Sequence, residues 1–187
     1  MTKLSAKAIK QFVWIDLEMT GLDHTNDSIL EIATIITQPT LEVIAYGPTL
    51  YITQPIDYMT KMNPEVYAMH KRSGLLEKVC SSSITLADAY AQTLQFIRMH
   101  CAKEEAVLCG NSIWQDRLFL KQYMPNILEH LNYRMVDVST LKVLINNWYP
   151  VGHNTEFQKS NAHRALEDIQ ESIDELKHYR AHFFIKN

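Results

Sequence analysis

Residues 12–23 read FVWIDLEMTGLD, an apolar run interrupted by two acids, Asp16 and Glu18. The apolar residues predict a buried strand. Side chains two positions apart on a strand point to the same face, so the two carboxylates should lie side by side. Burying a carboxylate is costly unless its charge is compensated. A divalent cation would compensate both, because it binds carboxylate oxygens readily. The alternative is a strand with one solvated face.

Composition favours one globular domain. The chain has 187 residues, of which 47% are hydrophobic and 21% charged, and it contains few glycines and prolines. We therefore expect a single domain over residues 1–187, without linkers. No apolar run approaches the roughly 20 residues of a membrane span, and we expect no signal peptide. The net charge of −3 argues against a broad nucleic-acid track, so any such contacts should be few and local.

The cysteines indicate a reducing compartment. Cys80, Cys101 and Cys109 are odd in number and no two have CxxC spacing. We interpret them as reduced thiols in or near the core of a cytoplasmic protein.

The order of predicted elements indicates an α/β fold. Strands over 12–18, 29–37 and 42–53 should form an antiparallel meander. Helices and strands then alternate: a helix from Asn63-Pro64 to about 73–74, a helix over 86–100 after a Thr85/Asp88 capping box, a strand over 106–110, a helix over 112–124, a strand over 133–139, a helix ending at Pro150, a loop over 151–160, and a helix from about 164 to 182. This order predicts a mixed sheet covered by helices.

Further acids occupy suggestive positions. Asp116 falls in the first turn after the strand over 106–110, where it can lean over the strand's end. Asp168 lies in the last helix, where a solvated acid is the plainer interpretation; Glu167, Glu171, Asp174 and Glu175 are expected to face solvent. His163 lies five residues earlier and can reach the same pocket only from outside that helix. A structural role is the alternative for this histidine.

Four blocks in order make a specific pattern: FVWIDLEMTGL, GNSIWQDRLFL, YRMVDVSTLK and HRALEDIQESIDEL. Together they resemble the DEDDh family of 3′-5′ exonucleases, and within it the oligoribonuclease family, from about residue 10 to 182. The resemblance implies a ribonuclease H-like mixed sheet, with an antiparallel meander plus parallel strands, flanked by helices. It also implies two divalent cations (Mg²⁺ or Mn²⁺), a homodimer, and hydrolysis of very short single-stranded RNA, notably dinucleotides, to 5′-mononucleotides.

The resemblance also implies residue roles. Asp16, Glu18, Asp116 and Asp168 match the metal-binding acids, and His163 matches the general base. The substrate-binding positions are Leu22 as a wedge between bases, His70 as a base contact, Ser112, Arg134 and Ser139 on the 5′-phosphate, and Tyr133 from the second subunit. One position departs from the family pattern: Glu65 replaces an aromatic residue that stacks on a base, and Tyr67 is the candidate substitute.

Two other functions fit parts of the pattern. A tRNA-trimming or DNA-proofreading DEDDh exonuclease would share the four acids and His163, without needing the phosphate-capping set. A catalytically silent nucleotide-binding module should have lost one of those five residues, and none is lost. His178 and His182 have metal-like spacing, but a solvated helix face explains them better.

Overall fold

A computed structural model of the chain describes residues 8–59, 62–150, 152, 155–158 and 163–184. Its sheet runs in the order β3-β2-β1-β5-β6, and β4 also pairs with β2. β1 to β3 are antiparallel neighbours, whereas β5 and β6 run parallel to β1. The predicted meander with added parallel strands is therefore confirmed. The strand bounds are β1 Gln11–Met19, β2 Ile29–Thr37, β3 Val43–Tyr46, β4 Leu50–Tyr51, β5 Ala106–Gly110 and β6 Asn132–Asp137.

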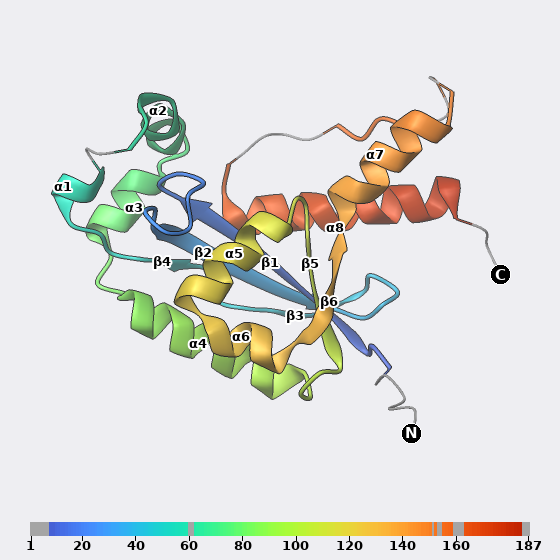
Figure 1. Ribbon diagram of the computed structural model, residues 1–187, viewed down its shortest axis with the longest axis horizontal. Helices are drawn as coiled ribbons and strands as arrows, with labels where there is room; N and C mark the ends of the chain where they lie inside the picture. The colour runs from blue at the N-terminus through green and yellow to red at the C-terminus, as the bar shows by residue number, and fades with distance from the viewer. Residues whose placement is uncertain (1–7, 60–61, 151, 153–154, 159–162, 185–187) are drawn as a thin grey trace.

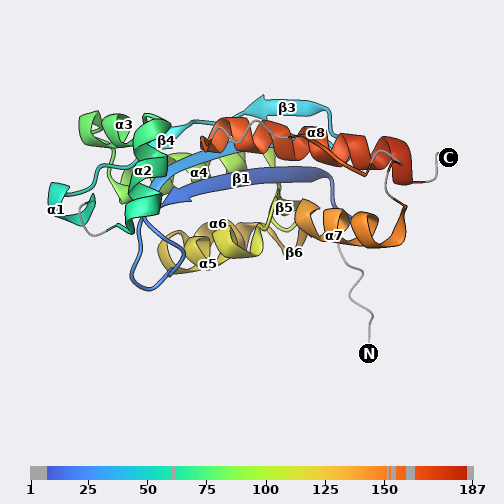
Figure 2. The ribbon, with the colours of Figure 1, turned by 90° about the horizontal axis from the view of Figure 1, so that it is seen from above.

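Helices cover both faces of the sheet (Figure 1). α7 and α8 pack on one face, while α4, α5 and α6 pack on the other. Seen from above, α8 lies lengthwise along the sheet, with α2 and α3 beyond its N-terminal end (Figure 2). The helix bounds are α1 Ile56–Met59, α2 Pro64–Arg72, α3 Leu75–Ser81, α4 Leu86–His100, α5 Trp114–Tyr123, α6 Pro125–His130, α7 Val138–Trp148 and α8 Ala165–Phe183.

Local signals explain where the helices begin and end. The side chain of Asn63 accepts the Glu65 amide at 2.9 Å, and Pro64 opens α2 as predicted. Thr85 and Asp88 form the predicted capping box at the start of α4. Gly74 separates α2 from α3 with a φ of 72°, which a residue without a Cβ adopts at little cost.

The strand predicted over 42–53 is wrong in extent, because β3 and β4 are separate. The break falls at Gly47, where a Cβ would lie 2.6 Å from the Phe96 ring. The Gly47 N–H still donates to the Thr34 carbonyl of β2 at 2.8 Å, but the next residue, Pro48, has no N–H with which to continue the ladder. The short helices α1, α3 and α6 were not predicted; Pro125, which opens α6, suggests only the end of the preceding helix.

Alternation along β1 aims the acids at α8. Val13, Ile15 and Leu17 belong to the core shared with α4, α5 and α6. Trp14 belongs to the core shared with α7 and α8. Even-numbered side chains therefore face α8, and Asp16 and Glu18 are among them.

The thiols differ in accessibility. Cys101 and Cys109 are buried as predicted, but Cys80 is exposed on α3, with its Sγ 4.0 Å from Met59 Sδ. The core or near-core prediction is therefore wrong for Cys80, because its position on the short helix α3 faces outward. Among the described residues, no helix is both long enough and apolar enough to cross a membrane.

Candidate active site

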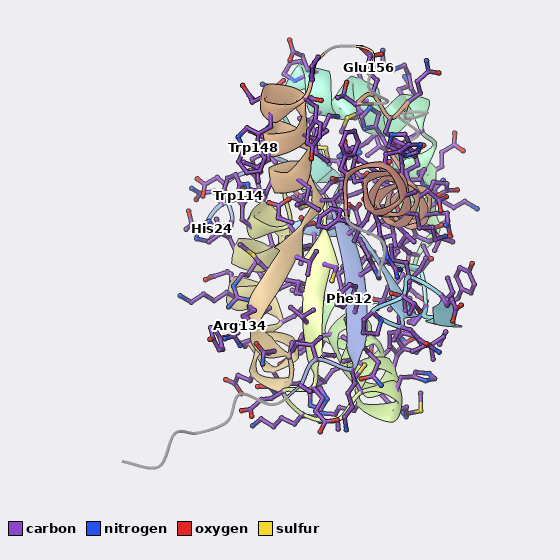
Figure 3. The ribbon with its side chains drawn as sticks, turned by 90° about the vertical axis from the view of Figure 1, so that its right-hand side faces the viewer. Phe12, His24, Trp114, Arg134, Trp148 and Glu156 are labelled. Atoms are coloured by element: carbon purple, nitrogen blue, oxygen red, sulfur yellow. The ribbon has the colours of Figure 1, made fainter. Side chains whose placement is uncertain are left out.

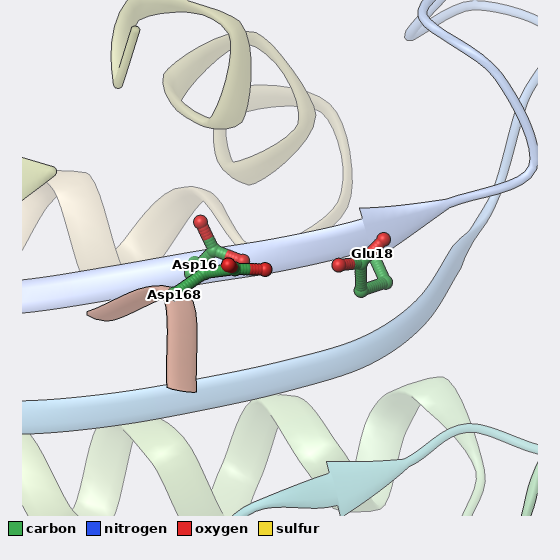
Figure 4. Close-up of side chains that lie close together, drawn as sticks. All are labelled: Asp16, Glu18 and Asp168. Atoms are coloured by element: carbon green, nitrogen blue, oxygen red, sulfur yellow. The ribbon is translucent and has the colours of Figure 1, made fainter. Parts of the chain in front are cut away.

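Three carboxylates meet where β1 passes under the start of α8. Asp16, Glu18 and Asp168 each offer an oxygen within 4.8 Å of the others (Figure 4). The first two come from alternate positions of β1, and Asp168 comes from the first turn of α8. Glu18 is buried and Asp16 half-buried, so this is not a solvated strand face. The predicted side-by-side placement of Asp16 and Glu18 is confirmed.

Asp116 approaches the same strand from α5. Its Oδ1 accepts the Leu17 backbone N–H at 3.0 Å. The pairing of β1 with β5 ends at Trp14 and Cys109, so the two strands part before Leu17 and leave room for this buried side chain. Asp116 lies outside the group of three acids, but its charge acts on Asp16. The predicted lean over the end of β5 is therefore what the structure shows.

Burial and mutual repulsion make these acids hard to ionise. Burial, followed by the charges of Asp116, Glu18 and Asp168, raises the pKa of Asp16 well above its usual range. Burial and the charge of Asp168 raise the pKa of Glu18 to about 8. Burial raises the pKa of Asp116 to about 7, against the lowering effect of the Leu17 N–H. A divalent cation would reverse these shifts, since it supplies the missing positive charge to oxygen ligands already close together. The donor set therefore fits a metal site.

His163 lies outside the last helix, as predicted for a histidine that shares a pocket with Asp168. α8 begins at Ala165, with Arg164 as its N-cap residue. His163 is exposed and has a φ of 51°, in the left-handed region. The next residue's backbone N–H donates to Asp168 Oδ2 at 3.0 Å. The histidine thus starts a tight turn that ends on one of the three acids.

His70 is buried under the end of β1. Its Nε2 donates a hydrogen bond to the Met19 carbonyl oxygen at 2.7 Å, and its Nδ1 lies 3.7 Å from Glu18 Oε2. Burial lowers the pKa of His70. The ring is therefore oriented toward the acidic strand, with no exposed surface. Its contact with a base stays a prediction.

Leu22 projects from the loop that follows β1. Its side chain is 72% exposed. Its carbonyl accepts from Gln115 Nε2 at 2.6 Å, and the base of the loop is closed by Thr20 Oγ1 donating to Asp27 Oδ1 at 2.8 Å. An exposed apolar side chain is thus presented by a braced loop, which suits insertion between bases.

Two of the predicted phosphate-capping residues meet. The Ser112 amide donates to Asp137 Oδ1 and to Ser139 Oγ, both at 2.9 Å, and the two serine hydroxyl oxygens are 3.2 Å apart. Ser112 has a φ of 48°, which turns the end of β5 toward the start of α7.

Arg134 and Tyr133 lie near the start of β6, away from the two serines. The Arg134 guanidinium stacks over the Tyr133 ring, 4.6 Å from its centroid. At about 3.3 Å per residue, roughly 10 Å of strand separates Arg134 from Asp137. Figure 3 shows Arg134 toward the start of β6. Within one chain, the structure therefore does not bring this pair to the two serines.

Comparison with known proteins gives the family. The profile of the Exonuclease family matches residues 13–176. The oligoribonuclease of Haemophilus ducreyi is 47% identical over 176 residues, covering 94% of this chain and 96% of the relative. That of Francisella tularensis subsp. tularensis is 49% identical over 168 residues, covering 90% and 93%. The chain belongs to the oligoribonuclease family. It is a 3′-5′ exoribonuclease, a hydrolase of phosphodiester bonds.

Solved structures support the ribonuclease H-like fold of this oligoribonuclease family member. Exonuclease I from Methylocaldum szegediense superposes with a TM-score of 0.72 at 16% identity, over 93% of this chain. The chain spans 41% of the length of that exonuclease.

The departure from the oligoribonuclease pattern on α2 lies at the surface. Glu65 and Tyr67 are both exposed in the first turn of the helix. The suggestion that Tyr67 replaces the missing aromatic residue stays a prediction.

Sequence reasoning missed four buried or bridging polar residues: Glu31, Asn111, Arg164 and Glu175. Glu175 was expected to face solvent, and that is wrong. It is fully buried, and its oxygens accept from Tyr179 Oη at 2.8 Å and Asn111 Nδ2 at 3.0 Å. α8 packs against both the sheet and α7, so its buried arc is wider than one apolar stripe. Glu31 had a readable signal, because it interrupts an apolar strand as Asp16 does.

Proposed function

We propose that residues 1–187 act as a single cytoplasmic domain that degrades very short RNA, notably dinucleotides, from the 3′ end to 5′-mononucleotides. The convergence of Asp16, Glu18 and Asp168 carries this proposal, with Asp116 beside them. Such a set of oxygen donors suits the charge that develops during phosphodiester hydrolysis.

The acids would hold two divalent cations, Mg²⁺ or Mn²⁺. When bound, these cations supply positive charge to the attacking and leaving oxygens of an in-line displacement. Asp16, Glu18 and Asp168 supply oxygens from the α8 side, and Asp116 supplies its second oxygen from α5. Their raised pKa values describe the metal-free chain and should fall on loading.

His163 would accept the proton of the attacking water. Imidazole is a common general base in enzymes that work near neutral pH. Its exposed position before α8 leaves it free to meet a scissile phosphate over Asp168. The products would be a 5′-mononucleotide and the shortened RNA.

Selection for short chains would come from a closed pocket. The hydroxyls of Ser112 and Ser139 would donate to the substrate's 5′-phosphate, and Leu22 would pack between the bases. The net charge of −3 offers no extended track for long RNA. Binding energy would therefore come from a few local contacts.

A second copy would complete this pocket as a homodimer. β6 is at the edge of the sheet, and its Tyr133 is 71% exposed. Trp148 of α7 is equally exposed, and Figure 3 shows it with Arg134 and Trp114 on the side of the molecule where β6 and α7 lie. An open strand edge beside exposed aromatic side chains favours pairing with a second copy. The partner's Tyr133–Arg134 pair would then reach Ser112 and Ser139.

A product-length time course tests the proposal. Purified protein is incubated with 5′-labelled RNAs of two to ten nucleotides and Mn²⁺, with Asp16→Asn as the matched inactive control. We expect dinucleotides to disappear fastest. Dinucleotides that persist while longer RNA is trimmed would favour a tRNA-trimming enzyme. Equal cleavage of single-stranded DNA would favour a proofreading enzyme.

A further inference from the structure

A partly buried ion pair lies beside the acidic site. Glu31 of β2 is fully buried and stands opposite Glu18 in the antiparallel register. Its Oε2 accepts from Arg164 Nε at 3.3 Å. Burial raises the pKa of Glu31, while the charge and hydrogen bond of Arg164 oppose that shift. One partner of such a pair cannot be removed without leaving the other charge buried and uncompensated.

The Arg164 guanidinium reaches beyond Glu31. Nη2 donates to Tyr51 Oη of β4 at 2.6 Å, and Nη1 donates a long hydrogen bond of 3.5 Å to the Ser73 carbonyl at the end of α2. The guanidinium carbon, Cζ, lies 5.4 Å from the centre of the Tyr51 ring. One side chain therefore ties the start of α8 to β2, to β4 and to the α2–α3 turn.

The backbone of Arg164 connects this tether to the site. Its N–H donates to Asp168 Oδ2 at 3.0 Å, which holds that carboxylate toward Asp16 and Glu18. His163 precedes it directly, in a left-handed conformation that needs support from its surroundings. Arg164 is therefore hydrogen-bonded to Asp168 through its backbone and directly follows His163 in the chain.

We propose that Arg164 is a positioning residue that fixes His163 and Asp168 by anchoring the start of α8 to Glu31 and Tyr51. This inference rests on the proposed function, because it takes His163 as the base and Asp168 as a metal ligand. Arg164 acts through these two residues and does not touch the reacting atoms.

Arg164→Gln is the direct test, and Arg180→Gln is its matched control. Arg180 is an exposed arginine of the same helix, and its Nη1 donates to the Thr40 carbonyl at 2.7 Å. We expect Arg164→Gln to lower kcat on a dinucleotide by roughly 10- to 100-fold, the usual effect of removing a group that orients a metal ligand. KM should change little, and Arg180→Gln should match the wild type.

Two further measurements separate positioning from charge balance and from folding. Glu31→Gln/Arg164→Gln removes both charges and should fold, yet kcat should stay low because the tether is gone. Recovery of wild-type kcat in this double variant would overturn the inference, since Arg164 would then only neutralise Glu31. In metal-free protein, amide hydrogen exchange at residues 164–168 should be faster in Arg164→Gln than in Arg180→Gln. Unchanged exchange would also overturn it.

His163→Ala in the same assay keeps the two proposals distinguishable. A fully active His163→Ala variant would refute the assigned base, and so the proposed mechanism. An inactive His163→Ala variant beside a fully active Arg164→Gln variant would refute only the positioning role.

Discussion

Replacing Glu18 by glutamine should stabilise the metal-free protein while removing its activity. The pKa of Glu18 is raised from 4.5 to about 8, chiefly by burial and by the charge of Asp168. The folded protein therefore keeps a proton that the unfolded chain releases, so stability falls as pH rises from about 4.5 to 8. At about 1.4 kcal/mol per pH unit, this group alone would cost on the order of 4 kcal/mol by pH 8.

In EDTA at pH 8, we expect Glu18→Gln to raise the free energy of unfolding by about 2–4 kcal/mol. The lower end allows for the neighbouring carboxylates, which share the bound protons with Glu18. For a chain of this length, that is a rise in Tm of roughly 5–15 °C. The gain should fade toward pH 5, where Glu18 is protonated in the folded state. Thermal unfolding followed by circular dichroism measures it, with exposed Glu77→Gln as the control. A Glu18→Gln variant no more stable than wild type at pH 8 would refute this account of the site's electrostatics.

Four further outcomes are expected. Asp16→Asn should abolish turnover with little loss of fold, and EDTA should inactivate the wild type reversibly; hydrolysis by metal-free protein would contradict this. His163→Ala should lower kcat by roughly 10²–10⁴-fold with Mn²⁺ binding by calorimetry largely unchanged. Arg134→Ala should erase most of the preference for a 5′-phosphorylated over a 5′-hydroxyl dinucleotide, about 1.5–3 kcal/mol in kcat/KM. Activity should fall on dilution in step with dimer dissociation in sedimentation runs.

Alternation and capping made much of the fold predictable. The period of two in β1 placed Asp16 and Glu18 on one face, and the Thr85/Asp88 pair marked the start of α4. These patterns involve residues close together in the chain, so they can be interpreted without knowledge of the tertiary structure. The helices α1, α3 and α6 have four to seven residues, too few for a periodic pattern to emerge.

The missed parts of the site depend on contacts between distant segments. Arg164 and Glu31 are 133 positions apart, and only the packing of α8 on β2 brings them together. Asn111 and Glu175 meet in the same way across α8 and the end of β5. A polar residue within an apolar strand, such as Glu31, can be predicted to be buried. The sequence alone does not indicate which distant residue it pairs with.

Because the three thiols differ in burial, a thiol-reactive probe should label a single cysteine of the unmodified protein. The thiolate is the reactive form of cysteine. Burial raises the pKa of Cys101 to about 11 and that of Cys109 well above its usual range, so both should resist alkylation. Cys80 alone is exposed. A maleimide dye should therefore attach at one place, on the helix that follows α2 and its buried His70, and its fluorescence would report oligonucleotide binding without an engineered cysteine.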